Sequence, residues 1–138
     1  VFVGVTDQIS KIGTTDIANE MIEVHFRKKP WEHWDFFLKR SPIYYAHQSE
    51  TATLILHGKA DARVDPGQSR ELYRHLKLRG KGPVRLVLYP GEGHGNRMAA
   101  ARLDYHLRTL RWMERYLNGG KPKIPAADID YKKAMGAD

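Results

Sequence analysis

No cysteine occurs among the 138 residues. Disulfide bonds, thiolate metal sites and a cysteine nucleophile are therefore excluded. The chain also lacks an apolar run of about 18 residues, the length that a transmembrane helix needs, so we expect no membrane partner. These absences leave the compartment open. For a soluble protein of this kind we favour the cytoplasm over the periplasm or secretion.

Acidic residues are outnumbered by basic ones. The sequence has 16 Asp and Glu against 23 Lys and Arg, which gives a formal net charge of +7. A basic balance can indicate nucleic-acid binding. Here the basic residues are scattered, the longest basic run is Arg27–Lys29, and no helix-turn-helix or RNA-binding signature accompanies it. We interpret the charge as a basic protein surface and expect no nucleic-acid partner.

The sequence begins without a methionine and without a signal-peptide pattern. Val1–Val5 is instead a continuous apolar run, typical of a strand buried on both faces of a parallel sheet. We therefore expect the chain to be the C-terminal part of a longer polypeptide, whose N-terminal remainder is a partner. An unpaired edge on this strand would also favour self-association.

Two further apolar runs, Thr53–Leu56 and Val84–Tyr89, predict buried strands. A helical pattern follows each of them. Pro66–Leu78 begins with proline and ends before a glycine, and in Arg97–Leu117 leucine and methionine recur every three or four residues. Strands that alternate with helices predict an α/β fold with parallel strands and right-handed crossovers.

An acidic residue and a histidine follow these two strands. Asp61 comes after the turn that ends Thr53–Leu56, and His94 lies in the glycine-rich turn after Val84–Tyr89. In parallel sheets functional side chains gather beyond the carboxyl ends of the strands. An acid and a histidine in these places form the second half of a nucleophile–histidine–acid triad. The pattern is equally compatible with an incidental histidine in a glycine loop.

The region before the second strand is less regular. Helical spacing with Asp16 as N-cap predicts a helix that ends before Pro30, and Trp31–Leu38 predicts another short helix. We interpret its aromatic side chains as core residues or as contacts with the missing part of the chain, with the wall of a substrate pocket as the alternative. Asp7 follows an apolar run, and we interpret it as a helix cap rather than a catalytic acid.

Several motifs, in their order and spacing, resemble the prolyl oligopeptidase family (S9) of serine peptidases, in its acylaminoacyl-peptidase and dipeptidyl-peptidase-like branch. The resemblance covers nearly everything but the tail. The motifs are HGKADARV (His57–Val64), PGQSRELYRHLK (Pro66–Lys77) and LVLYPGEGHG (Leu86–Gly95), with supporting similarity in ISKIGTTDIANEM (Ile9–Met21) and WDFFLKRSPIYY (Trp34–Tyr45).

The resemblance implies the C-terminal portion of an α/β-hydrolase fold, with residues 1–117 in the catalytic domain and 118–138 as an exposed tail. It implies that Asp61 is the acid and His94 the base of a Ser-Asp-His triad that acts on peptides or acyl-peptides, with no cofactor and no metal. Asp65 is the rival acid, next to the expected helix start. Arg63 would steady the acid loop through a salt bridge or remain solvated.

The nucleophile of such a triad is missing. The chain has four serines, none in a Gly-x-Ser-x-Gly motif: Ser10, Ser41, Ser49 and Ser69. The resemblance implies that the serine and the oxyanion hole lie upstream of Val1, and we expect the isolated chain to be inactive. A carboxylesterase-type hydrolase of the same fold and a non-catalytic α/β interaction module are the alternatives. A metal role for His57 with His94 is disfavoured, because no histidine pair has the helical i,i+4 spacing.

Overall fold

A computed structural model describes residues 1–118 and 123–136. At its centre lie two parallel strands, β1 (Thr53–Gly58) and β2 (Val84–Tyr89), paired in continuous register along their length. Helix α5 (Pro66–Arg79) is the crossover between them, and it ends at Gly80 in the left-handed conformation, with φ 70°. The apolar runs and the proline and glycine at the helix ends predict these three elements, and the α/β fold is confirmed.

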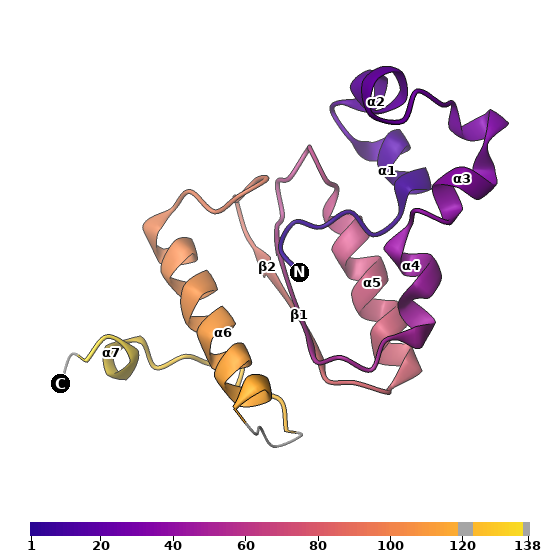
Figure 1. The fold of residues 1–138 in the computed structure, drawn as a ribbon. Coiled ribbons are helices and arrows are strands. Elements are labelled where there is room, and N and C mark those ends of the chain that lie inside the picture. The colour runs from indigo at the N-terminus through magenta and orange to yellow at the C-terminus, as the bar shows by residue number, and fades with distance from the viewer. Residues whose placement is uncertain (119–122, 137–138) are drawn as a thin grey trace.

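Helices cover both faces of the sheet (Figure 1). One face lies under α5 and α4 (Pro42–Tyr45), and the other lies under α6 (Ala99–Leu117). The α1–α3 region lies near the end of the sheet at which both strands finish. The other helical elements are α1 (Gln8–Thr14), α2 (Ala18–Glu20), the π-helix η1 (Met21–Phe26), the 3-10 helices η2 (Pro30–Glu32) and η3 (Ala46–Gln48), α3 (Trp34–Leu38), α4 (Pro42–Tyr45), α6 (Ala99–Leu117) and α7 (Tyr131–Ala134).

Strand β1 is buried on both faces. Ile55 belongs to an apolar cluster with Leu72 and Leu76 of α5. Its neighbours Leu54 and Leu56 belong to a second cluster with Trp112 of α6. Successive side chains of a strand point to opposite faces, so this two-sided burial explains why the run is apolar without alternation.

The N-terminal segment does not form the predicted strand. Its contact with the sheet is limited to a single parallel bridge between Phe2 and Leu56, with backbone hydrogen bonds from Val1 and Val3 to β1, and Val1 is 53% exposed. Val3 has a left-handed backbone conformation, with φ 43°, which turns the chain away from the extended path. The prediction of a buried strand over Val1–Val5 is therefore wrong.

The two aspartates of the N-terminal region have different partners. Asp7 caps α1, as predicted, by accepting the N–H groups of Ile9 and Ser10. Asp16 does not cap the following helix, whose N-cap is Ile17 without a side-chain hydrogen bond. The Asp16 carboxylate accepts Arg63 Nε at 2.7 Å instead, because the fold brings the turn after β1 beside it.

The aromatic side chains around α3 divide into two groups. Phe37 is fully buried and makes edge-on contacts with Phe26 and Phe36. Trp31 and Trp34 are 61% and 54% exposed. The core interpretation is correct for Phe37. The two tryptophans are not core residues, and their contact with the missing part of the chain stays a prediction.

The leucine spacing of α6 predicts that its leucine stripe packs on the sheet, but a different face of the helix does so. Trp112 is buried, and Tyr105 and Tyr116 pack against the same apolar cluster. Leu117, in contrast, is 74% exposed. The residues of the leucine stripe are Leu103, Leu107, Leu110, Met113 and Leu117. Large aromatic side chains fill the space over the strands, which leaves the C-terminal end of this stripe in solvent.

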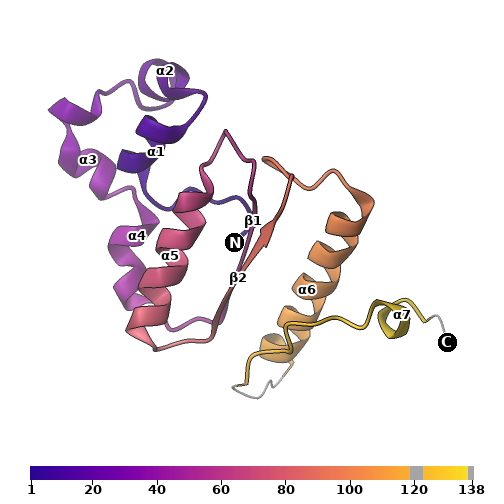
Figure 2. The same ribbon diagram turned by 180° about the vertical axis from the view of Figure 1, so that it is seen from behind.

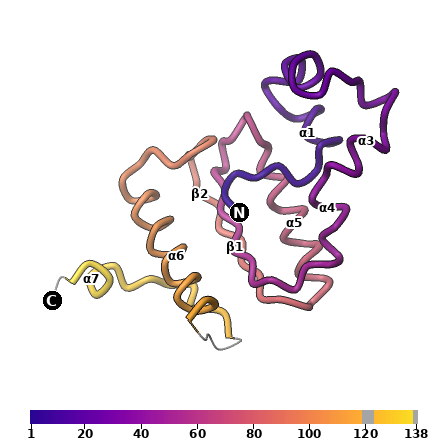
Figure 3. The backbone as a smooth tube through the Cα atoms, viewed as in Figure 1, coloured from indigo at the N-terminus to yellow at the C-terminus, as the bar shows by residue number. Residues whose placement is uncertain are grey.

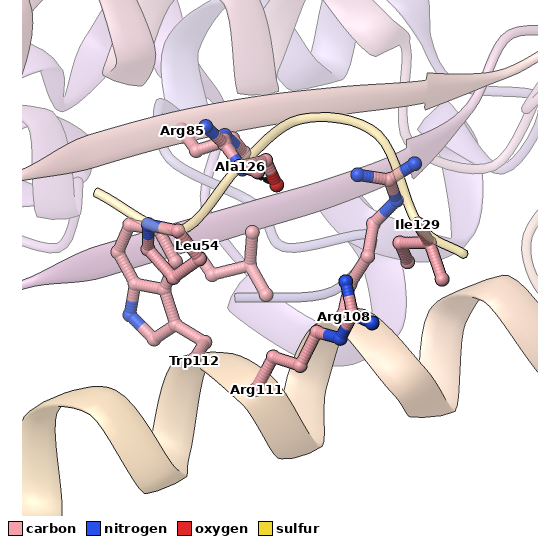
Figure 4. A pocket seen from close by; sticks show the side chains of 8 residues that line it. Leu54, Arg85, Arg108, Arg111, Trp112, Ala126 and Ile129 are labelled. Carbon is pink, nitrogen blue, oxygen red and sulfur yellow. Dashed lines mark hydrogen bonds between the residues drawn. The ribbon is translucent and has the colours of Figure 1, made fainter. Parts of the chain in front are cut away.

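The segment after α6 is largely exposed where the structure describes it, but hydrogen bonds and one buried side chain attach it to the fold. Arg85 of β2 donates to the Ala126 carbonyl at 3.0 Å, and Arg108 of α6 donates to the Ala127 carbonyl at 2.8 Å. Ile129 is buried. The segment runs along α6 (Figure 2), and it arches over the arginines of a hollow between α6 and the strands (Figure 4). Residues 119–122 and 137–138 of the predicted tail lie outside the described residues, and the division at residue 117 stays a prediction.

Among the residues that the structure describes, no helix has both the length and the apolar character needed to cross a lipid bilayer.

Candidate active site

The acid loop is built around the carboxylate of Asp61. This side chain is completely buried. Its Oδ1 atom accepts the backbone N–H groups of Arg63 and Val64, each at 2.9 Å. The carboxylate thereby closes the turn after β1, and these two hydrogen bonds fix the direction of its second oxygen.

His94 meets that second oxygen. Its Nδ1 atom lies 2.9 Å from Oδ2 of Asp61. The chain leaves β1 and β2 at the same end of the sheet (Figure 3), which brings the two loops together. Gly93 and Gly95 pair across His94 in an antiparallel bridge, and Gly95 has φ 150°, a conformation that favours glycine. The imidazole therefore projects from the tip of a tight turn.

The protonation of the His94 ring follows from its partner. A carboxylate at neutral pH only accepts hydrogen bonds, so Nδ1 of His94 carries the proton and donates it. Nε2 is then free to accept a proton, and no side chain in residues 1–118 or 123–136 hydrogen-bonds to it. The side chain is 45% exposed. The arrangement suits a general base that faces a substrate.

A second imidazole lies behind the same carboxylate. His57 is fully buried, and its Nε2 atom is 2.8 Å from the Val64 carbonyl and 3.1 Å from Asp61 Oδ2. The carbonyl only accepts, so Nε2 is the donor and Nδ1 accepts the hydroxyl of Ser69 at 2.6 Å. Both ring nitrogens of His57 are occupied, and the described ranges contain no group of three or more potential metal ligands.

Charged side chains of the N-terminal region form hydrogen bonds with the acid loop. Lys11 is 4% exposed, and its Nζ atom donates to the Arg63 carbonyl at 3.0 Å. Burial, together with the positive charge of Arg63, lowers the pKa of Lys11. The Arg63 side chain donates to Asp16, which lowers the pKa of that carboxyl, so the predicted Arg63 salt bridge is present.

The rival acid has a structural partner. Asp65 is the N-cap of α5, and its carboxylate accepts the N–H of Gly67 at 2.6 Å. The structure thus places Asp61, and not Asp65, against His94. Asp7 is engaged at the start of α1.

A hollow of about 480 Å³ lies beside His94. Its lining consists of the turn after β2 and one residue of the acid loop: Ala60, Gly91, Glu92, Gly93, His94, Gly95, Asn96, Arg97 and Met98. A substrate could approach the imidazole from this side.

None of the serines is bonded to His94 in the described part of the chain. Ser69 is buried against His57, and Ser41 is buried and donates to the Phe37 carbonyl at 2.8 Å. Ser10 accepts a hydrogen bond from Gln68. These hydroxyl groups serve the packing of the helices.

Sequence reasoning missed Glu92. Its side chain is 2% exposed although it lies in a glycine-rich turn two residues before His94. The sequence offers one signal, a single carboxylate between Gly91 and Gly93. An acidic residue in such a turn is ordinarily interpreted as exposed to solvent. Its burial depends on contacts that only the folded chain makes.

The chain was compared with known proteins. Residues 2–120 match the family described as the prolyl oligopeptidase family. The acylamino-acid-releasing enzyme of Rattus norvegicus is 35% identical over 117 residues, which are 78% of this chain and 15% of the enzyme. The enzyme of the same name from Sus scrofa is 36% identical over 110 residues, 75% of this chain and 15% of the enzyme. The chain thus spans a small part of the length of these relatives.

Solved structures have the same fold. Pyrococcus horikoshii acylaminoacyl peptidase superposes with a TM-score of 0.81 at 22% identity, over 90% of this chain and 20% of that protein. A Mycobacterium tuberculosis puromycin-hydrolyzing peptidase superposes with a TM-score of 0.69 at 22% identity, over 89% of this chain and 18% of that protein.

Proposed function

The chain belongs to the prolyl oligopeptidase family, and from this premise we propose that it supplies the acid and the base of a serine-peptidase active site. In this proposal Asp61 is the acid and His94 is the base. The observation that supports it is the 2.9 Å contact between Asp61 Oδ2 and His94 Nδ1, at the end of the sheet where both strands finish. Because this contact uses Nδ1, the other ring nitrogen of His94, Nε2, is available to accept a proton.

The proposed chemistry uses the two nitrogens of His94 differently. Nε2 removes the proton from a serine hydroxyl as its oxygen attacks the carbonyl carbon of the scissile bond. The imidazolium then returns that proton to the leaving amine. Asp61 holds the ring through Nδ1–H and stabilises its positive charge. The hydrogen bonds from Arg63 and Val64 keep the carboxylate in place during both steps.

The nucleophile in this proposal comes from polypeptide outside the chain. Of the serines that the structure describes, Ser41 and Ser69 are buried against other groups, and none is hydrogen-bonded to His94. The relatives are several times longer than the region they share with this chain. We therefore propose that residues 1–117 complete a catalytic domain together with an N-terminal remainder, that the sheet edge at Phe2 contributes to this association or to self-association, and that the chain alone is inactive.

Acylated peptides are the substrate class that we propose for the complete site. Support comes from the relatives at 35% and 36% identity, both of which are named acylamino-acid-releasing enzymes. The serine mechanism itself serves esters as well as amides, so the substrate class rests on those names and not on the geometry of the pair.

The experiment is fluorophosphonate labelling, read by intact mass, of the 138-residue chain and of a longer polypeptide that includes the preceding region. We expect no adduct on the chain alone and one adduct on the longer protein. His94→Ala should abolish that adduct. His106→Ala, which removes an exposed histidine of α6, is the matched control and should leave it unchanged.

Three outcomes would contradict the proposal. A stoichiometric adduct on the isolated chain would show that one of its own serines is the nucleophile. An adduct on the longer protein that survives His94→Ala would exclude His94 as the base. Turnover of p-nitrophenyl butyrate but not of acetyl-alanine p-nitroanilide by the longer protein would identify an esterase.

A further inference from the structure

Glu92 is a buried acidic residue whose charge no cation balances. Its side chain is 2% exposed, and within residues 1–118 and 123–136 no Lys, Arg or His nitrogen forms a salt bridge with it. A buried carboxylate is costly unless hydrogen bonds replace the lost water. Here the replacements are backbone N–H groups only: Oε2 accepts Arg97 at 2.7 Å, and Oε1 accepts Met98 at 3.0 Å.

These two N–H groups lie directly before α6, which begins at Ala99. Met98 is the N-cap of that helix, and its own side chain makes no capping hydrogen bond. The first N–H groups of a helix have no partner within the helix and favour a negative charge. Glu92 supplies that charge from outside the helix, across the turn. Its side chain thereby closes a loop from residue 92 to residue 98, and His94 lies inside this loop.

The backbone of Glu92 is also tied to the acid loop. Its carbonyl oxygen accepts the N–H of Ala60 at 2.8 Å, and Ala60 immediately precedes Asp61. Gly58 at the end of β1 packs directly against the carbonyl groups of Glu92 and Gly93. One residue therefore joins the turn that carries the acid, the turn that carries the histidine and the N-cap of α6.

We propose that Glu92 is a positioning residue for His94: its buried carboxylate, clamped by the N–H groups of Arg97 and Met98, sets the turn that aims the imidazole at Asp61. The proposal deepens the function proposed above and rests on it for its catalytic meaning. Glu92 itself does not reach the imidazole and acts through the backbone of the turn.

The test uses Glu92→Gln, which keeps the size of the side chain and removes its charge. A carboxylate offers both oxygens to the two N–H groups. The amide offers one oxygen, and its NH₂ group would face an N–H donor. We expect the turn to shift and the hydrogen bond from His94 Nδ1 to Asp61 to be lost.

The readout is NMR of the 138-residue chain with ¹⁵N-labelled histidine. We expect a downfield Nδ1–H proton of His94 in the unaltered chain, and loss of that signal both in Glu92→Gln and in Asp61→Asn, which assigns it. Glu114→Gln, the same change at an exposed position of α6, is the matched control and should retain the signal. Far-UV circular dichroism checks that each variant is folded. A folded Glu92→Gln chain that retains the signal at the same position would overturn the proposal.

A second measurement covers the case in which Glu92→Gln does not fold. In the unaltered chain the amides of Arg97 and Met98 should exchange with solvent more slowly than the amide of Ala62, an exposed residue of the neighbouring turn. Exchange as fast as that of Ala62 would show that the clamp does not exist. Neither measurement depends on turnover. If the His94→Ala variant of the longer protein remained active, the proposed function would be refuted, whereas the positioning of His94 by Glu92 would still be decided by these two measurements.

Discussion

Gly58 lies so close to Glu92 that a β-carbon on Gly58 would collide with the carbonyl oxygen of Glu92. The end of β1 and the turn that carries His94 are thus in backbone contact, with no room for a side chain between them. The Ala60 N–H bond to the Glu92 carbonyl fixes the same contact two residues further on.

Gly58→Ala should therefore push the His94 turn away from the acid loop. Overpacking of this kind costs about 1–3 kcal/mol. We expect a loss of stability in this range by urea denaturation, together with loss of the His94 Nδ1–H signal by NMR. The backbone atoms that the methyl group meets cannot rotate aside as a flexible side chain would.

Gly13→Ala is the matched control. Gly13 lies in α1, and nothing is within 4 Å of the place where its β-carbon would be. Alanine is favoured over glycine inside a helix by roughly 0.5–1 kcal/mol. The control should be neutral or slightly stabilising, and equal destabilisation by both changes would refute the contact at Gly58.

Ser69→Ala tests the buried imidazole behind Asp61. The change removes the hydroxyl that donates to Nδ1 of His57 and leaves a buried acceptor without a partner. Such a loss costs about 1–3 kcal/mol. We expect a lower free energy of unfolding by urea denaturation, whereas Ser49→Ala, in the loop before β1, should change it little. An unchanged stability in Ser69→Ala would contradict this role of the hydroxyl and would show that water replaces it at Nδ1 of His57.

The site was partly predictable because it depends on strand ends. Two apolar runs place Asp61 and His94 beyond the ends of parallel strands, and this topology brings their loops together. The absence of a strand over Val1–Val5 was not predictable in the same way. Val3 adopts a positive φ, and valine is a residue type that rarely does so. Glu92 is a polar residue in sequence and a core residue in the fold. Its burial depends on the start of α6 folding back onto the turn.

The faces of α6 and the path of the last segment also escaped prediction. Leucines at helical spacing mark one stripe, yet Trp112 and its tyrosine neighbours cover the strands because they are larger. The residues after α6 have no hydrophobic period. Their place is set by carbonyl groups that accept Arg85 and Arg108, and such backbone bonds leave no trace in sequence patterns.

Asp104 should make stability depend on acid. Burial opposes its ionisation, but hydrogen bonds from Arg108, Tyr131 and Tyr89 outweigh burial and hold its pKa below the ordinary value of 3.8. A group whose pKa is lower in the folded state contributes stability that is fully present well above its unfolded pKa. That contribution is lost as the pH falls through 3.8 towards the folded-state value.

Asp104→Asn should therefore be destabilised by about 1.5–3 kcal/mol at pH 7, in the range of hydrogen bonds to charged groups. The difference from the unaltered chain should shrink as the pH falls through 3.8 towards the folded-state pKa, because below that lower pKa the carboxyl group is protonated in both states. Urea denaturation at neutral and acidic pH measures both differences. Asp128→Asn, at an exposed position of the segment after α6, should show neither effect, and a difference that stays constant with pH would contradict the assignment.

Ile129→Ala tests whether the segment after α6 belongs to the folded core. Ile129 is 8% exposed and lies in the arch that crosses α6 and the strands (Figure 4). Truncation of a buried isoleucine costs about 2–5 kcal/mol, since apolar contact is lost and a cavity remains. We expect a loss near the lower end, because the segment is held on one side only. Met135→Ala, at a position that is 58% exposed, should have no measurable effect. Equal stability of the two variants would mean that the arch opens in solution, and the arginine–carbonyl bonds of Arg85 and Arg108 would then contribute nothing to the fold.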